Sequence, residues 1–172
     1  MLRENRVLWY ALRIRAGHEK ASAHALRCRG LEEFLPVYTS IRRWSDRSKE
    51  IEMPLFPGYV FCRFDLAERV SVLTTQGVRE IVGIGRDPYA VDENEINVLQ
   101  TVVKSGLLRQ PWPFLKVGEH VVIREGPLRN INGILTEIRG DHKLIVSITL
   151  LQRSVAVNVE RAWVKPLASQ DA

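Results

Sequence analysis

The stretch that most constrains the fold runs from Pro54 to Phe64 and reads PLFPGYVFCRF. Proline holds φ at about −65° and glycine accepts positive φ, so Pro57-Gly58 predicts a tight turn. The residues after the turn alternate as in a strand, although both faces of that strand are apolar. One face would hold Tyr59, Phe61 and Arg63, and the other Val60, Cys62 and Phe64.

The second apolar face allows two interpretations. Aromatic residues in strands usually lie in the core, which favours an ordinary buried strand entered through a bend. Alternatively, Phe56 and Tyr59 form a surface patch that another protein covers. The residue chemistry alone favours the first interpretation and leaves the second open.

The remaining N-terminal sequence predicts a mixture of strands and helices. Alternation of apolar residues indicates strands, and apolar residues at helical spacing indicate helices. The expected strands are 7–14, 31–41, 59–64 and 78–84, and a basic segment at 42–49 is expected to cap a hairpin. The expected helices are 18–29, a short one opening at Asp65, and one from Asp92 to about Lys104.

The composition changes beyond residue 104. Ser105-Gly106 and Pro111-Trp112-Pro113 predict an extended connector. Short Val- and Ile-rich segments follow, separated by turn sequences, which is typical of a small β-barrel. Inside a helix Pro costs about 3 kcal/mol and Gly about 1 kcal/mol, so residues 113–172 are predicted to form strands.

The composition favours some functions and argues against others. The chain has 172 residues and a net charge of +5, which favours acidic partners such as nucleic acid. Cys28 and Cys62 lie far apart, so neither a disulfide scaffold nor a zinc site is expected, and this usage suits a reducing cytoplasm. No apolar run approaches a membrane span, and Met1–Arg6 is not followed by a signal-peptide core.

No group of residues predicts catalysis. The four histidines are scattered, and no phosphate-binding glycine loop occurs. We therefore expect a binding protein that is not an enzyme and that uses no metal or other cofactor.

Two motifs together resemble the NusG family of transcription elongation factors. Trp9-Tyr10, a following helix, and Phe56-Pro57-Gly58-Tyr59-Val60 are similar to its N-terminal domain, and 126–133 (GPLRNING) resembles a KOW motif. The resemblance implies an α+β fold. A four-stranded, mostly antiparallel sheet with about three helices forms an RNA polymerase-binding domain at 1–106, and a linker at 107–116 leads to an SH3-like KOW barrel at 117–172.

The resemblance also implies which residues bind RNA polymerase. In the family, the N-terminal domain grips the clamp helices of the large polymerase subunit. Phe56, Pro57 and Tyr59 match the motif directly, Arg13 projects from the adjoining strand, and Ile84 and Ile96 follow from alignment of the fourth strand and third helix.

The basic segment at 42–49 has two interpretations. It is either a solvated hairpin tip or a finger that contacts upstream or non-template DNA, with guanidinium groups on phosphates and an indole stacked on a base. The stretch 43–47 (RWSDR) is similar to the hairpin of specialised NusG paralogues that control single long operons. The residues in question are Arg42, Arg43, Trp44, Arg47 and Lys49.

The KOW loop likewise has two interpretations. Leu128 and Ile131 either fill the end of the barrel or, with Arg129, contact a partner. In the family this end binds Rho or a small-subunit ribosomal protein. This chain has aliphatic residues where many members have Phe.

The sequence thus predicts a cytoplasmic, monomeric elongation factor that suppresses pausing and termination and recruits a partner through its KOW domain. One alternative is a housekeeping NusG that aids Rho-dependent termination. Another is a ribosome-associated, RNA-binding KOW protein. None of these features indicates which operons the protein would serve.

Overall fold

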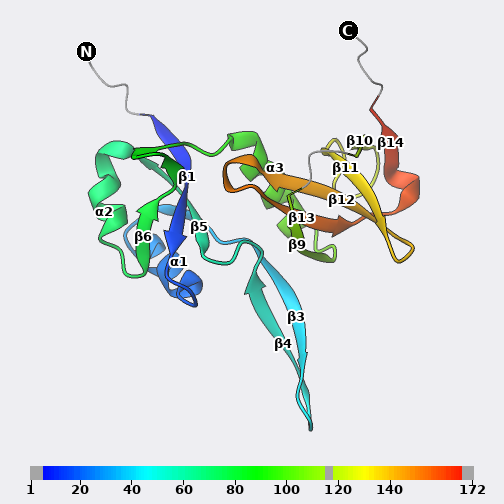
Figure 1. Ribbon diagram of the computed structural model, residues 1–172, viewed down its shortest axis with the longest axis horizontal. Helices are drawn as coiled ribbons and strands as arrows, with labels where there is room; N and C mark the ends of the chain where they lie inside the picture. Colours follow the sequence, from blue (N-terminus) through cyan, green and yellow to red (C-terminus); the bar gives the residue numbers. More distant parts are fainter. Residues whose placement is uncertain (1–5, 115–117, 168–172) are drawn as a thin grey trace. The chain divides into compact units, whose positions relative to one another are not determined.

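The computed structural model describes residues 6–114 and 118–167, and its contacts divide the chain into two units, Met1–Glu93 and Asn94–Ala172. Figure 1 shows the order of the elements along the chain. The division falls earlier than the predicted domain limit at 106. The first five residues, used above to argue against a signal peptide, lie outside the described residues, as does the predicted barrel start at 117.

The strand predicted after the Pro57-Gly58 turn is β5, and it lies inside a four-stranded sheet. The strand order is β2-β5-β1-β6, and every pairing is antiparallel. Both edges of β5 are therefore hydrogen-bonded, and the predicted antiparallel sheet is confirmed. The strands are β1 (Val7–Ile14), β2 (Glu32–Phe34), β5 (Tyr59–Asp65) and β6 (Val78–Ile81).

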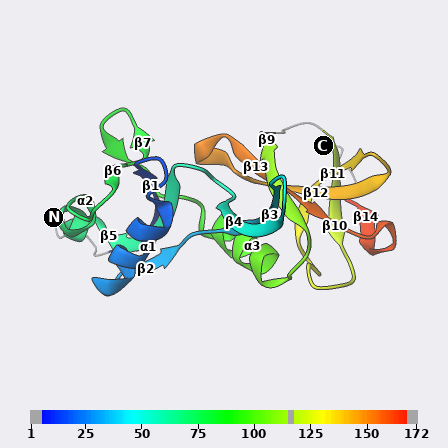
Figure 2. The same ribbon diagram turned by 90° about the horizontal axis from the view of Figure 1, so that it is seen from below.

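Two helices, α1 (Glu19–Cys28) and α2 (Arg69–Leu73), pack on one face of this sheet (Figures 1 and 2). A short 3-10 helix, η1 (Leu66–Glu68), precedes α2, and the predicted cap at Asp65 accepts a hydrogen bond from the Ala67 amide. The core on this face comprises Tyr10, Leu12, Ile14, Ala23, Leu26, Val60, Cys62, Phe64 and Val72.

The second face of the sheet is buried in its middle. Phe61 stacks on Phe34 at 6.2 Å between ring centroids and meets Phe56 edge to face at 5.7 Å. Trp9 and Ala11 are buried on the same face of β1. Phe61 and Phe64 of β5 are therefore core residues, as the first interpretation of this strand expected, whereas Tyr59 is half-buried.

The predicted hairpin is a two-stranded ribbon of β3 (Val37–Arg43) and β4 (Ser48–Pro54), which extends away from the sheet (Figure 1). The sequence predicted one extended segment at 31–41, whereas the structure divides it at Pro36 into β2 and β3. Proline cannot donate to a sheet ladder. The Pro36 carbonyl instead accepts a hydrogen bond from the Leu55 amide, which closes the base of the hairpin.

The predicted strand at 78–84 is shorter than expected. β6 ends at Ile81, and a separate small hairpin follows, made of β7 (Gly83–Ile84) and β8 (Asp87–Pro88). A side chain at Gly83 would lie 1.9 Å from the Asp87 carbonyl oxygen, so the hairpin closes only over glycine.

The second unit contains α3 (Glu93–Lys104), which begins at the unit boundary, and an antiparallel sheet in the order β14-β10-β11-β12-β13-β9. The predicted β-rich tail is confirmed. Its elements are β9 (Arg109–Pro113), β10 (Glu119–Ile123), β11 (Asn132–Ile138), β12 (Asp141–Ile148), η2 (Thr149–Leu151), β13 (Arg153–Asn158), η3 (Arg161–Trp163) and β14 (Val164–Pro166).

Part of the predicted linker at 107–116 belongs to this sheet. β9 pairs with β13, and Trp112 packs on the buried cluster of Ile134, Ile145 and Ala156. Partial burial of the indole ring favours pairing of the segment, and its prolines are tolerated because β9 is an edge strand. The two units are defined by spatial contacts, whereas a domain is a part that folds by itself. The predicted domains at 1–106 and 117–172 therefore stay a prediction.

We expect Gly126→Ala to destabilise the second unit more than Gly140→Ala. Both glycines have φ near +80°, so both substitutions cost about 1–2 kcal/mol of backbone strain. Only a Cβ at Gly126 would meet the Trp163 ring, at 3.0 Å, whereas a Cβ at Gly140 meets nothing. The clash should add about 1–3 kcal/mol. Urea titration followed through the β12 amide resonances measures both values, and equal losses would contradict the contact.

The two thiols should differ sharply in reactivity. Cys28 is exposed on α1, whereas Cys62 is buried and its pKa is raised to about 12, mainly by burial and then by Glu33 and Glu32. The thiolate is the reactive form, so Cys62 should be inert at pH 8. Titration with a disulfide reagent should find one fast thiol in the native protein and two after unfolding. Cys28→Ser should remove the fast reaction, and persistence of that reaction would refute the assignment.

Candidate functional site

The Pro57-Gly58 turn has the geometry that its sequence predicts. The Phe56 carbonyl accepts a hydrogen bond from the Tyr59 amide at 3.1 Å, and Gly58 has φ +84°. Proline followed by a glycine with positive φ is the preferred centre of a type II turn. The Ile14 amide also donates to the Gly58 carbonyl at 2.7 Å, which ties the turn to the end of β1.

Three side chains form a row across β5, β1 and β6 next to this turn. Tyr59 pairs with Arg13 in the ladder, and Arg13 pairs with Glu80. The Arg13 guanidinium lies 5.9 Å from the centre of the Tyr59 ring, and its Nε lies 3.0 Å from a Glu80 carboxylate oxygen. We call these three residues, with the exposed Pro57, the turn-proximal surface.

The turn-proximal surface is better suited to binding a protein partner than to stabilising the fold. More than half of the Arg13 and Glu80 side-chain surfaces is exposed. Exposed ion pairs of this kind contribute at most about 1 kcal/mol to folding. Tyrosine and arginine are, however, the residue types that most often dominate protein–protein binding energy.

The other residues predicted to bind polymerase, Phe56, Ile84 and Ile96, lie outside the turn-proximal surface. Phe56 is only 1% exposed and Ile96 is fully buried. The expectation that Phe56 forms a surface patch with Tyr59 is therefore wrong, because its ring turns inward onto Phe61. Ile84 is 65% exposed at β7, and Ile96 belongs to α3 of the second unit.

The basic hairpin tip is exposed over residues 41–50. The Trp44 amide donates to the Arg47 carbonyl at 2.8 Å, so the two residues face each other across the tip. The Trp44 side chain is 61% exposed. A shallow pocket of about 370 Å³ is lined by Trp44, Arg47, Ser48, Lys49 and Ile51. The structure thus brings the predicted indole and cations together at one end of the ribbon.

The KOW loop has a buried and an exposed part. Leu128 is fully buried and Ile131 is 7% exposed, as the barrel-filling interpretation expected. Arg129 is exposed between them, next to Asn130, which has φ +68°. The aliphatic side chains therefore shape the loop, and Arg129 is the member of the predicted set that is available to a partner.

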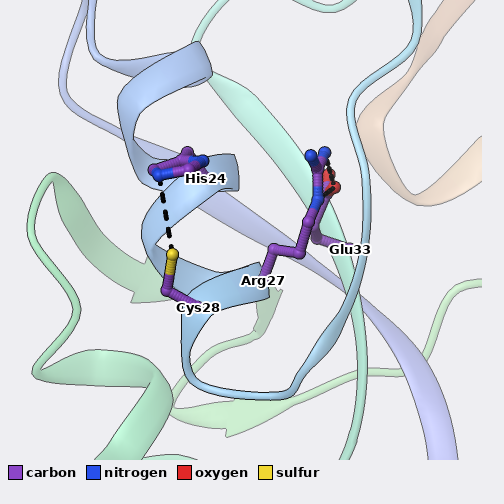
Figure 3. A network of polar contacts seen from close by, with 4 residues as sticks. All are labelled: His24, Arg27, Cys28 and Glu33. Carbon is purple, nitrogen blue, oxygen red and sulfur yellow. Dashed lines mark hydrogen bonds and ion pairs between the residues drawn. The ribbon is translucent and has the colours of Figure 1, made fainter.

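A polar network lies on α1 (Figure 3). His24 Nε2 lies 3.5 Å from the Cys28 sulfur, and the Arg27 side chain is hydrogen-bonded and ion-paired with Glu33 on β2, which raises the pKa of Arg27. Within 6–114 and 118–167, no group of three or more His, Cys, Asp or Glu side chains could hold a metal ion. The Arg27–Glu33 pair joins α1 to β2 at the edge of the sheet, whereas the His24–Cys28 contact lies within α1.

Two acidic residues of the site were not found from the sequence. Glu80 completes the row beside Arg13, and the buried Glu19 accepts a hydrogen bond from the Gly58 amide at 2.9 Å. Neither residue lies in a recognisable motif, since each acquires its role through pairing between distant segments.

None of the helices in the described part of the chain is long and apolar enough to cross a membrane.

Comparison with known proteins gives a consistent result. Residues 8–100 match the family described as "Transcription termination factor nusG". The transcription termination/antitermination protein NusG of Campylobacter jejuni is 31% identical over 154 residues, which cover 81% of this chain and 87% of the relative. The corresponding protein of Pseudomonas aeruginosa is 26% identical over 171 residues, covering 91% and 97%.

A solved structure described as "Domain interaction in Thermotoga maritima NusG" has a similar fold. Its TM-score is 0.56 at 22% identity, and the match covers 94% of this chain and 98% of the other.

Proposed function

Because the chain belongs to the NusG family of transcription termination/antitermination factors, we propose that it binds RNA polymerase through its first unit and suppresses pausing and termination. The proposed partner surface is the clamp of the large polymerase subunit. The protein acts there as a cytoplasmic, monomeric brace, without covalent chemistry or a cofactor. The named relatives support a transcription factor over a ribosome-associated KOW protein.

The observation that supports polymerase binding most directly is the turn-proximal surface. It presents an aromatic ring, a guanidinium and an exposed proline on a rigid sheet. Complete burial of a tyrosine covers about 150–250 Å², or about 4–6 kcal/mol at about 25 cal/mol/Å² before the costs of association. Tyr59 is already half-buried, so its exposed part can contribute a fraction of that value. This single anchor, joined by Arg13 and by the exposed Ile84, can account for a specific complex.

Loss of the ring and the guanidinium should weaken the complex. We expect Tyr59→Ala combined with Arg13→Ala to lower the affinity for core RNA polymerase at least tenfold, because Arg13 is exposed, Tyr59 is half-buried, and both residue types often dominate protein–protein binding energy. Titration of labelled protein with core polymerase measures the change. Tyr59→Phe, which keeps the ring, should bind nearly normally.

Arg69→Ala is the matched control for charge, since Arg69 is exposed on α2, which packs on the other face of the sheet. An unchanged affinity of the double variant would exclude the turn-proximal surface as the polymerase contact. A double variant that unfolds would show that the two side chains support the sheet.

The hairpin tip supports a second contact, to upstream or non-template DNA. Its cations are exposed, and Trp44 offers a flat face next to them. Guanidinium groups bind phosphates through paired hydrogen bonds, and an indole stacks on any unpaired base. We propose that Arg42, Arg43, Trp44, Arg47 and Lys49 contact DNA in the elongation complex, which would suit a specialised, operon-restricted factor.

Replacing Arg42, Arg43 and Arg47 by alanine should reduce DNA crosslinking in the elongation complex while sparing binding to core polymerase. Each lost phosphate contact should flatten the log–log salt dependence by about 0.7–0.9. The matched control replaces the same three residues by lysine, which should keep the salt dependence. Unaltered crosslinking of the alanine variant would identify the hairpin as a solvated tip.

The second unit supplies the proposed recruitment surface. A partner bound at the KOW loop, either Rho or a small-subunit ribosomal protein, would meet the exposed Arg129 on a loop that Leu128 and Ile131 support from inside. A housekeeping factor that aids Rho-dependent termination is the alternative within the same family. Binding of Rho by this loop would favour that alternative.

A further inference from the structure

Glu19 is a buried carboxylate in the first turn of α1, with only 8% of its surface exposed. The other buried residues of this helix are Ser22, Ala23 and Leu26, which are small or apolar. Burying a charged group is costly unless hydrogen bonds compensate for the lost water. The partner of Glu19 therefore indicates why a carboxylate is kept at this position.

That partner is the backbone of the Pro57-Gly58 turn. The Glu19 carboxylate accepts a hydrogen bond from the Gly58 amide at 2.9 Å. The turn's own hydrogen bond uses the amide of Tyr59, so it leaves the Gly58 amide without a partner in the turn. An unsatisfied, partly buried amide would destabilise the turn, and the carboxylate removes this cost.

Both polar groups of the Gly58 backbone are thus held by different elements. Its amide is bound by α1 and its carbonyl by the Ile14 amide at the end of β1. The residue that follows is Tyr59, whose ring faces Arg13. A displacement at Gly58 would therefore be transmitted directly to the first side chain of the turn-proximal surface.

We propose that Glu19 is a positioning residue that holds the Pro57-Gly58 turn and thereby presents Tyr59 and Arg13 in their binding geometry. The inference rests on the proposed polymerase contact and adds a residue that does not itself touch the partner. Fixing a binding surface before the encounter lowers the entropic cost of association. Loss of the carboxylate should therefore weaken binding while the sheet stays folded.

The first experiment measures the turn in the free protein. Amide hydrogen exchange at Gly58 should accelerate at least tenfold in Glu19→Ala relative to the native chain. Glu19→Gln, whose amide oxygen can still accept the hydrogen bond, should restore most of the protection. Thr75→Val is the matched control, because Thr75 is a buried polar residue just after α2 whose hydroxyl donates a hydrogen bond to the Ser71 carbonyl, away from the turn.

The second experiment measures binding to core RNA polymerase in a double-mutant cycle. Glu19→Ala should weaken binding about tenfold, and Glu19→Gln and Thr75→Val should change it less than twofold. In the Tyr59→Ala background the additional effect of Glu19→Ala should fall below about threefold, because the side chain it positions is gone. A loss caused by general destabilisation would instead be the same in both backgrounds.

The outcomes separate this inference from the proposed function. Unchanged Gly58 exchange in Glu19→Ala, or additive losses in the cycle, would overturn the positioning role even if the native chain binds polymerase. Failure of the native chain to bind would overturn the proposed function and the binding consequence together. The exchange measurement would still decide whether Glu19 holds the turn.

Discussion

The antiparallel pairing of β1 with β5 is the constraint on which the first unit depends. Its register sets Arg13 opposite Tyr59 at the exposed end and Ala11 opposite Phe61 in the buried middle. A shift by one residue would reverse which side chains face the helices, because strand side chains alternate with a period of two. The Pro57-Gly58 turn stands where this pairing begins, and its hydrogen bonds to Ile14 and Glu19 hold the register.

Burial divides one face of the sheet into a structural part and a binding part. Phe61, packed between Phe34 and Phe56, belongs to the core. One row further along, Tyr59, Arg13 and Glu80 are partly or fully exposed. The same pair of strands therefore supplies both the rigid support and the exposed aromatic and charged groups, which is how a small unit can offer a preorganised surface.

The parts of the site that depend on local chemistry could be predicted from the sequence. The φ preferences of Pro57 and Gly58 dictate the turn, and a charged Arg- and Lys-rich segment between strands dictates an exposed hairpin tip. Glu80 and Glu19 could not be predicted, because their roles come from a strand register and from a helix packed over a turn. Phe56 was misplaced because an aromatic residue beside a turn has the same sequence pattern whether its ring faces solvent or folds back onto the core.

The sequence by itself determined the strand alternation, the Pro57-Gly58 turn, the hairpin, the β-rich tail and the motifs typical of the NusG family. These follow from backbone preferences and from a period of two, which act over a few residues. The tertiary structure decided which aromatic residues are exposed, that a buried carboxylate secures the turn, and that part of the proline-rich connector pairs as β9 beside Trp112. Those outcomes depend on packing between segments far apart in the chain, where burial and the need to satisfy backbone hydrogen bonds override local preference.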